Sequence, residues 1–462
     1  MSNIAFFQNR LGRTDGVSLE VDKWKHILTK ELGHHVFYCS GNEDVEGNYV
    51  IPELYAAHEV TEKILINATR EFKDYSTEAE LELEIYNHAD KIEAKLLQFI
   101  EENNIEMLIP NNLCSGGFQP AAAIAFHNVV RKTGLPTIIH SHDFYFESEL
   151  SKEVFPTCYV AKSIYNRYFP TNLPNVKHVV INKLSQLWLK ENKNIDALVV
   201  PNVFDFDQKE WKLDEFNADF RQAIGVSEND LVFLQATRVL DRKGIELAID
   251  FVATIKNDPQ LRHKLEKTET AVQGTYHDDA RIVLVCAGII ETIGISGEYW
   301  KKLNEKALSA GIDLIYCGDL VQHSRNSNPS KKIYSLWDAY INADFVTYPS
   351  LWEGWGNQLI EAVFAKLPFV IFEYPVFVSD IEEKGFLYTT LGREFEINYK
   401  SGLAEVKKEM LEIAAVKAVE ILSNKEAKIE MVNHNFEVAK GNFSFEQLKE
   451  HIIHLLDTDE RG

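Results

Sequence analysis

The chain has 462 residues, more than one ordinary hydrophobic core needs, so its length favours two domains. It carries 48 basic and 70 acidic residues, which gives a formal net charge of −22. An acidic surface of this kind repels nucleic acid and anionic membranes and argues against both as partners. Any anionic ligand must therefore meet a local cluster of cations and hydrogen-bond donors.

The five cysteines are scattered and form no C-x-x-C pair. Three of them, Cys39, Cys286 and Cys317, lie in or beside apolar strand-like runs, where we expect buried free thiols and a reducing cytoplasm. The first residues, MSNIAFFQNR, lack the basic and apolar regions of a signal peptide. No uninterrupted apolar run approaches the length of about 20 residues that spans a bilayer. We therefore expect a cytoplasmic protein without stable membrane insertion.

In the first half of the chain, short apolar runs alternate with longer segments of helical period. This alternation is typical of βα units with a mainly parallel sheet. We expect an amphipathic helix at 17–32, and a helical elaboration of the first domain at 58–103, where the chain is highly charged. The expected strands are residues 4–7, 35–39, 107–110, 137–140 and 179–181.

A second series of βα units begins after Pro201, and residues 403–462 have the apolar spacing of helices. We predict an α/β protein with domains at 1–203 and 204–425 and with C-terminal helices at 426–462 that pack back on the first domain. Ligands of such folds bind beyond the carboxyl ends of parallel strands, so we expect a cleft between the two domains. The expected strands of the second half are residues 231–237, 282–287, 313–317, 345–348 and 369–372.

The stretch PSLWEGWGNQLIE, residues 349–361, follows an expected strand and contains two acids. Glu353 precedes a turn with glycines on both sides of Trp355, and Glu361 lies about one turn into the helix that starts near Asn357. A glycine turn at a helix start exposes backbone N–H groups and the positive end of the helix dipole. Each carboxylate can therefore accept hydrogen bonds from hydroxyls at opposite ends of a nucleotide sugar. A loop acid and a helix acid without a joint role is an equal alternative.

The segment ATRVLDRKGIELA, residues 236–248, places two cations around a turn between a strand and a helix. Arg238 follows the strand, and Lys243 precedes Gly244 at the helix start. Such a pair above a parallel sheet can bind a diphosphate, the arginine through its planar fork and the lysine as a point charge. Basic residues are also common in solvated turns, but the net charge of −22 favours a functional pair here.

The N-terminal loop QNRLGRTDGVSLEVDKW carries Gly12 and Gly16 between a strand and an amphipathic helix. Its glycines allow the backbone to approach a phosphate closely, although the full G-x-G-x-x-G spacing is absent. Asp15 can contact an acceptor hydroxyl or cap the helix, and capping is at least as well supported by the sequence.

The strand end IIHSHDFYFE, residues 138–147, places His140 and His142 on one side of a strand. A metal pair there lacks a clear third ligand, so a hydrogen-bonding role of His142 at the ligand site is the favoured interpretation. The segment VVPNVFDFD, which contains Asn202 and Asp205, is expected to be a hinge turn. The sequence contains no G-x-S-x-G, P-loop, H-E-x-x-H or kinase motif.

Together these motifs resemble the retaining family-4 glycosyltransferases of the GT-B fold. The segment PSLWEGWGNQLIEAVFAKLPFVI is similar to their PS-x-x-EGFG-x-x-x-x-EA-x-A-x-G-x-P-V-V block, and ATRVLDRKGIELAI is similar to their GR-x-x-x-x-KG phosphate loop. VVPNVFDFD and IYCGDL resemble the family's hinge and a strand end. The chain departs from these patterns where Thr237 and Lys366 replace glycine, Trp355 replaces phenylalanine and Phe364 replaces alanine.

The resemblance implies two Rossmann-like domains that face a central cleft, an acceptor domain at 1–203 and a nucleotide-sugar-binding domain at 204–425. It implies transfer of a hexose, with retention, from a donor of the UDP-glucose or GDP-mannose type. The acidic chain, which has no evident basic amphipathic helix, favours a small soluble acceptor such as a sugar, sugar phosphate or glycerate glycoside over a lipid, and it leaves a protein or polysaccharide acceptor open. The acceptor hydroxyl would be deprotonated with help from the departing nucleoside diphosphate. Neither a metal nor a cofactor besides the nucleotide sugar is expected.

The resemblance also implies roles for individual residues. Arg238 and Lys243 would stabilise the diphosphate, His142 would contact the transferred sugar, and Glu353 would hold it; these four are the expected catalytic residues. The expected acceptor-binding residues are Asp15 and His140. The expected donor-binding residues are Gly12, Gly16, Gly354, Trp355, Gly356, Asn357, Gln358 and Glu361.

Three alternatives use the same architecture. A nucleotide-sugar epimerase would need acid and base groups around the hexose. A glycoside phosphorylase would need a lysine-bound cofactor or a pocket for free phosphate. A nucleotide-sugar sensor would bind the donor without turnover. The sequence leaves the oligomeric state open.

Overall fold

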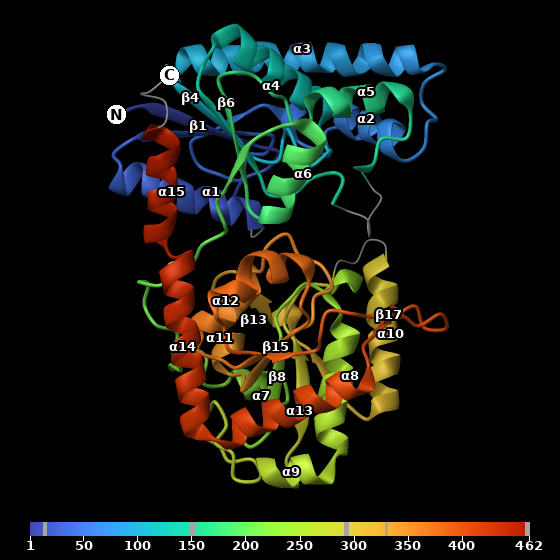
Figure 1. Ribbon diagram of the computed structural model, residues 1–462, viewed down its shortest axis with the longest axis vertical. Helices are drawn as coiled ribbons and strands as arrows, with labels where there is room; N and C mark the ends of the chain where they lie inside the picture. Colours follow the sequence, from blue (N-terminus) through green and yellow to red (C-terminus); the bar gives the residue numbers. More distant parts are fainter. Residues whose placement is uncertain (13–15, 148–153, 291–294, 329–330, 458–462) are drawn as a thin grey trace. The chain divides into compact units, whose positions relative to one another are not determined.

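The computed structural model describes residues 1–12, 16–147, 154–290, 295–328 and 331–457. The chain divides into two compact units (Figure 1). The first unit comprises Met1–Val203 with Phe445–Gly462, and the second comprises Phe204–Ser444. Each unit is built around its own mainly parallel sheet with helices packed on it, so the predicted α/β class is confirmed.

The first unit contains a seven-stranded sheet of order β3-β2-β1-β4-β5-β6-β7, in which all neighbours are parallel. All five strands expected in this half are present, and two further strands of three residues each, β3 and β7, complete the edges. The strands are β1 (Asn3–Gln8), β2 (His35–Ser40), β3 (Asn48–Val50), β4 (Met107–Pro110), β5 (Thr137–Ser141), β6 (Val176–Val180) and β7 (Ala197–Val199).

Alternate residues of β1 point to opposite faces of this sheet. Ala5 and Phe7 belong to a core cluster with α3 (Glu78–Glu102) and α4 (Pro120–Thr133), whereas Ile4 and Phe6 belong to a second cluster with α1 (Gly16–His26) and α15 (Phe445–Asp457). Both faces are therefore covered by helices, which is why the strand reads as a continuous apolar run. The further helices of this unit are α2 (Glu59–Thr69), α5 (Tyr159–Tyr168) and α6 (Lys183–Lys193).

The second unit contains a six-stranded parallel sheet of order β10-β9-β8-β14-β15-β16. Its central strands are buried throughout, and α8 (Ile245–Asn257) packs against α10 (Ile295–Ala310) and α13 (Lys408–Ser423). The strands are β8 (Leu231–Gln235), β9 (Ile282–Cys286), β10 (Asp313–Tyr316), β14 (Phe345–Tyr348), β15 (Phe369–Ile371) and β16 (Thr389–Thr390).

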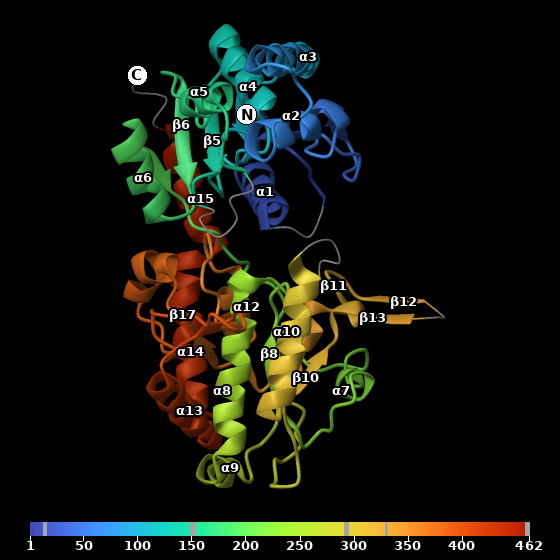
Figure 2. The same cartoon turned by 90° about the vertical axis from the view of Figure 1, so that its right-hand side faces the viewer.

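Two small sheets accompany the main sheet of the second unit. β12 (Asn326–Asn328) and β13 (Lys331–Ser335) pair antiparallel and project as a ribbon (Figure 2), and β11 (Val321–Gln322) pairs with β13 on its other side. The other small sheet joins β17 (Glu396–Ile397) to β18 (Ala404–Glu405). A short helix, α11 (Leu336–Ile341), follows β13 directly.

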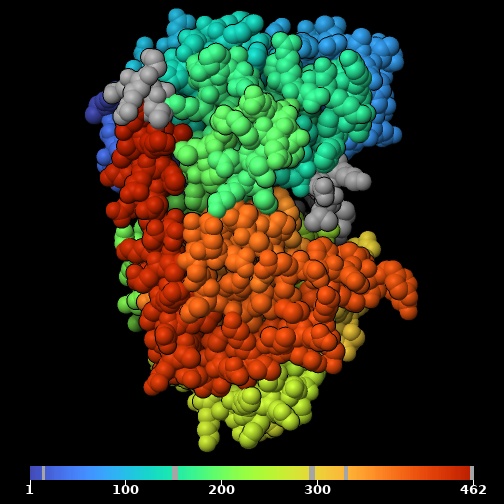
Figure 3. Space-filling model, in the orientation of Figure 1, coloured from blue at the N-terminus to red at the C-terminus, as the bar shows by residue number. Residues whose placement is uncertain are grey.

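The C-terminal helices divide between the units at a different place from the one expected at 426. α14 (Lys425–Phe443) belongs to the second unit, where it packs against α12 (Asn357–Phe364) and α13. The side chains of α13 and α14 cover much of one face of that unit (Figure 3). Extended backbone at Ser444 ends α14, and only α15 joins the first unit. The expectation that all of 426–462 packs on the first domain is therefore corrected.

All five cysteines are unpaired, and four are buried, including the three expected to be buried free thiols. Across the described ranges, no helix combines the length and the apolar character that crossing a membrane requires.

Candidate active site

Two loops of the second unit lie side by side because they follow neighbouring parallel strands, β8 and β14. The backbone N–H of Leu351 donates to the carbonyl of Arg242 at 2.9 Å, which joins the loop after β14 to the loop after β8. The two loops also meet at Gly244, which has φ +58° and lies against the carbonyl oxygen of Pro349. A Cβ atom at this position would overlap that oxygen. Only glycine lets the two loops approach this closely.

At this junction, two cations bind one carboxylate. The ammonium of Lys243 contacts Oε1 of Glu353, and Nη1 of Arg242 donates to Oε2 of Glu353 at 3.0 Å. The same Arg242 nitrogen donates to the carbonyl of Trp352 at 3.1 Å. Lys243 is 6% exposed and Glu353 8%, so the pair is almost fully removed from water. The sequence pattern indicated Lys243 and Glu353 separately and gave no sign that they contact each other.

The charges of this cluster determine its pKa values. Burial lowers the pKa of Lys243 to about 8, against the opposing attraction of Glu353. Burial alone would raise the pKa of Glu353, but the charges of Lys243 and Arg242 lower it to about 2. At neutral pH both groups are therefore charged. Arg238, exposed at the end of β8, adds a third positive charge that Lys243 senses, so the cluster is locally cationic in a chain of charge −22.

The glycine turn before α12 is fixed by a tyrosine. The hydroxyl of Tyr374 donates to the carbonyl of Trp355 at 2.5 Å, and a Cβ atom on Gly356 would overlap that hydroxyl. The Trp355 indole is 4% exposed and meets the ring of Phe443 edge to face, with ring centroids 5.2 Å apart. Its side chain is therefore a core residue of the second unit, and a donor contact at Trp355 stays a prediction for its backbone. Gly354, before it, lies half-buried on the loop.

The N-terminal turns of α12 carry three further predicted residues, all half-buried: Asn357, Gln358 and Glu361. The amide of Gln358 donates to the carbonyl of Ala236 at 3.0 Å, which ties the helix to the end of β8. Glu361 Oε2 accepts a hydrogen bond from the hydroxyl of Tyr340, 2.9 Å away. Burial, with the negative charge of Glu361, raises the pKa of Tyr340 and keeps this hydroxyl protonated.

In the first unit, the glycine loop is held against the segment that follows β2. Asn42 forms two hydrogen bonds with the backbone of Leu11. Its Oδ1 accepts from the Leu11 N–H at 2.8 Å, and its Nδ2 donates to the Leu11 carbonyl at 2.7 Å. Gly12 has φ +80°, and a Cβ atom there would lie 2.6 Å from the Val45 side chain. Gly16, exposed, begins α1, and Asp15 lies outside the described residues. Neither of the two interpretations of Asp15 is therefore tested.

The two histidines at the end of β5 lie in contact with their rings tilted by 38° and the ring centroids 4.0 Å apart. His142 Nε2 bonds to Asn111 Oδ1 at 3.1 Å, and the His142 backbone N–H donates to Asn112 Oδ1 at 2.7 Å. His140 packs on Trp24 and is 2% exposed, so an acceptor contact there stays a prediction. Within the described parts of the chain, no group of three or more histidine, cysteine, aspartate or glutamate side chains could hold a metal.

Burial keeps both histidines neutral. It lowers the pKa of His142 to about 3, with the positive charge of Lys23 acting in the same direction. Burial and the neighbouring ring lower the pKa of His140 as well. A neutral imidazole can exchange hydrogen bonds with a sugar hydroxyl, but it carries no positive charge with which to stabilise a leaving group.

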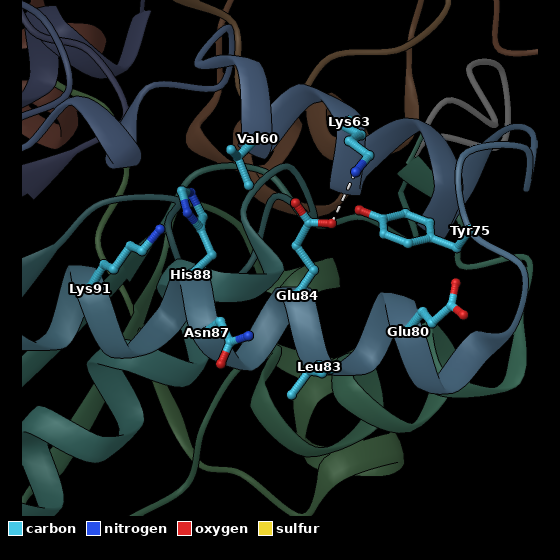
Figure 4. Close-up of a pocket in the computed structure, with 9 residues that line it drawn as sticks. All are labelled: Val60, Lys63, Tyr75, Glu80, Leu83, Glu84, Asn87, His88 and Lys91. Carbon is cyan, nitrogen blue, oxygen red and sulfur yellow. Dashed lines mark hydrogen bonds and ion pairs between the residues drawn. The ribbon is translucent and has the colours of Figure 1, made fainter.

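A separate hollow of about 400 Å³ lies between α2 and α3 of the first unit (Figure 4). Lys63 and Glu84 form an ion pair across it at 3.0 Å, and Tyr75 lies beside them. None of the predicted site residues lines this hollow. We therefore place the candidate site at the ends of β8 and β14.

Two residues of this site were missed by the sequence reasoning. Arg242 stands in the basic pair before Gly244, and that pair was a usable signal, although the arginine expected to act there was Arg238. Tyr340 precedes Glu361 by 21 residues on another helix, and no local pattern points to it.

Comparison with known proteins bears on this site. A family model described as glycosyl transferases group 1 matches residues 216–389, which include both loops. The mannosylglucosylglycerate synthase of Petrotoga mobilis is 37% identical over 87% of this chain and 89% of its own length. The enzyme of the same name from Thermotoga maritima is 36% identical over 97% of this chain and 98% of its own. A sucrose-phosphate synthase from Thermosynechococcus elongatus, 13% identical, superposes with a TM-score of 0.60 over 99% of both chains. Identity at the level of the first two relatives, over most of each chain, shows that this protein belongs to the group 1 glycosyl transferases.

Proposed function

We propose that this protein transfers a mannosyl group from a nucleoside diphosphate mannose to a hydroxyl of glucosylglycerate, with retention at the anomeric carbon. The observation that carries the proposal is the identity of 36–37% to two mannosylglucosylglycerate synthases over most of the chain. Their name describes a product of mannosyl, glucosyl and glycerate parts. A synthase can form it by adding a mannosyl group to a glycerate glycoside.

The cluster of cations around Glu353 supports the part of this proposal that concerns the nucleotide-sugar donor. A nucleoside diphosphate leaves with increasing negative charge, and fixed cations in a water-poor site stabilise that charge in the transition state. Lys243 and Arg238 would contact the diphosphate, and Glu353 would hold Lys243 in place before the donor binds. Because the leaving group meets protein cations, we propose that the reaction needs no metal ion.

The acid on α12 supports recognition of the nucleoside. Glu361 accepts from Tyr340 and can accept further hydrogen bonds from ribose hydroxyls through its remaining lone pairs. The half-buried Asn357 beside the glycine turn is placed on the same helix start, where backbone N–H groups favour anions. We propose that these groups bind the ribose and the proximal phosphate.

We propose retention because the motifs resemble those of retaining glycosyltransferases, and the proposal assigns no enzymic base among the described residues. His142 is neutral and already bonded to Asn111, so it serves as a hydrogen-bonding contact to the transferred sugar. The acceptor proton would pass to a phosphate oxygen of the departing nucleoside diphosphate as the acceptor oxygen bonds to the anomeric carbon from the same face. Glu353 is bound by two cations and is a poor candidate for this base.

The test incubates the purified chain with GDP-, UDP- and ADP-mannose and the corresponding glucose nucleotides, each with and without glucosylglycerate, in EDTA. The expected result is one mannosylated product whose anomeric NMR signals match the configuration of the donor. Inverted configuration would overturn retention, and activity only after added divalent metal would overturn metal independence.

The same assay separates the alternative functions. Donor epimers without acceptor would indicate an epimerase, and phosphate-dependent cleavage of the product would indicate a phosphorylase. Donor binding without turnover would indicate a sensor. A Lys243→Ala variant should lose most of the turnover, and unchanged turnover would remove Lys243 from the site.

A further inference from the structure

We propose that Arg242 is a positioning residue for the donor: by fixing Glu353 it sets the place at which the Lys243 ammonium meets the diphosphate. The inference rests on the proposed function. The GR-x-x-x-x-KG pattern that this segment resembles leaves the position of Arg242 unspecified, so the role is argued from this chain's own contacts.

Arg242 makes contacts with three consecutive residues of the neighbouring loop. Its backbone carbonyl accepts from Leu351 at 2.9 Å, and its Nη1 donates to the Trp352 carbonyl at 3.1 Å and to Glu353 Oε2 at 3.0 Å. The guanidinium carbon also lies over the Trp352 ring, 5.9 Å from its centroid. One side chain therefore fixes both the path of the loop and the carboxylate at its end.

The two oxygens of Glu353 are divided between the two cations. Arg242 binds Oε2, and Lys243 contacts Oε1. A carboxylate held at one oxygen by a planar, permanently charged group has little freedom to rotate. The flexible lysine is thereby held by the other oxygen in a single place. Without Arg242 the carboxylate can turn, and the ammonium turns with it.

Arg242 also acts on Lys243 through charge. Its positive charge is one of the causes, after burial, of the lowered pKa of Lys243. Loss of that charge removes a repulsion, so the pKa of Lys243 should rise. A role limited to holding the loop would not change the pH at which Lys243 loses its proton. The pH dependence of donor binding therefore distinguishes the two roles.

The experiment measures the dissociation constant of the productive nucleotide mannose by calorimetry between pH 6 and 9.5, without acceptor, for the wild type, Arg242→Gln and Arg242→Lys. Arg281→Gln is the matched control, because Arg281 pairs with Asp230 at 2.7 Å at the other end of β8 and β9. Circular dichroism checks that each variant is folded.

For the wild type, affinity should decline as the pH rises through about 8. In Arg242→Gln the dissociation constant at pH 7 should rise about tenfold, and the pH of the decline should move up by about one unit. Arg242→Lys keeps the charge, so the decline should stay near the wild-type pH while affinity is only partly restored. Arg281→Gln should bind as the wild type does.

This inference, but not the proposed function, would be overturned if Arg242→Gln bound the donor with wild-type affinity and lost affinity at the wild-type pH. It would also be overturned if Arg281→Gln lost as much donor affinity as Arg242→Gln. If the pH at which affinity falls moved equally in Arg242→Lys and Arg242→Gln, the positive charge of Arg242 would not be what lowers the pKa of Lys243. A wild-type chain that binds no nucleotide sugar would instead overturn the proposed function, and this inference with it.

Discussion

The hydroxyl of Tyr340, which is fully buried, donates to Oε2 of Glu361 across 2.9 Å. The tyrosine lies on α11 and the glutamate on α12, so the bond joins two helices of the second unit. A carboxylate that accepts a hydrogen bond from a rigid, buried donor is held in one orientation. The acid that we assign to the ribose is therefore oriented before any ligand arrives.

Tyr340→Phe should weaken donor binding by about tenfold. A hydrogen bond to a charged group contributes about 1.5–3 kcal/mol, and without it the Glu361 carboxylate loses its fixed orientation, so part of this free energy is lost from donor binding. The measurement is the donor dissociation constant at pH 7. Tyr334→Phe is the matched control, since the Tyr334 hydroxyl also donates to a carboxylate, Asp219, at 2.9 Å. Equal effects of both substitutions would contradict an orienting role for Tyr340.

Glu353→Gln should destabilise the second unit by about 3 kcal/mol at pH 7, because it leaves Lys243 and Arg242 without their countercharge. The pKa of Glu353 is lowered to about 2, so its stabilisation is fully present above about pH 4.5 and is lost as the pH falls toward 2. The difference between variant and wild type should therefore shrink below pH 4.5. Hydrogen exchange of α8 peptides in urea, at several pH values, measures this difference in the free energy of unfolding of the second unit.

The control for that experiment is Glu246→Gln. Glu246 is also buried, but burial raises its pKa, so the wild type should gain stability relative to this variant as the pH falls. Parallel pH trends for the two variants, or a Glu353→Gln difference that stays constant from pH 7 to 3, would refute the assignment of the Glu353 charge.

Gly244→Ala should destabilise the second unit more than Gly225→Ala. Both glycines have positive φ, +58° and +72°, so each alanine costs about 1 kcal/mol from backbone strain. At Gly225 nothing lies within 4 Å of the added Cβ, whereas at Gly244 it overlaps the Pro349 carbonyl. Thermal unfolding and donor affinity are the measurements. Only Gly244→Ala should also weaken donor binding, and equal behaviour of the two variants would refute the close approach of the loops.

The ring of His142 should stay neutral between pH 5 and 8, because burial and then Lys23 lower its pKa to about 3. Histidine NMR signals of the wild type, assigned by comparison with His142→Asn, test this. A titration midpoint of His142 above pH 6 would contradict the buried environment. Any acid limb of activity in that range must then come from another group.

Much of the fold was predictable because buried parallel strands read as apolar runs. All ten expected strands are present, and the resemblance drawn from PSLWEGWGNQLIE is confirmed by the comparisons. β3 and β7 were missed because strands of three half-buried residues have no distinct pattern. The unit boundary in the C-terminal helices was misplaced because helical spacing continues on both sides of Ser444.

The site was less predictable than the fold. Spacing could indicate Lys243 and Glu353, but only the pairing of β8 with β14 shows that they bind one another. Sequence reasoning assigned Trp355 to the donor through its backbone, which stays a prediction, and could not show that its indole packs on Phe443 of α14, 88 positions further along the chain. Contacts of this kind depend on how distant elements pack, which a local pattern does not encode.

The return of α15 to the first unit has a consequence for synthesis on the ribosome. Leu448, Ile452 and Leu455 complete the core cluster that contains Ile4 and Phe6 of β1. On the ribosome, β1 must therefore wait for α15 before that cluster is full, and the whole second unit is translated in between. For the same reason the first unit cannot be produced as one uninterrupted gene fragment. A circular permutant that joins the α15 segment ahead of β1 would supply it intact.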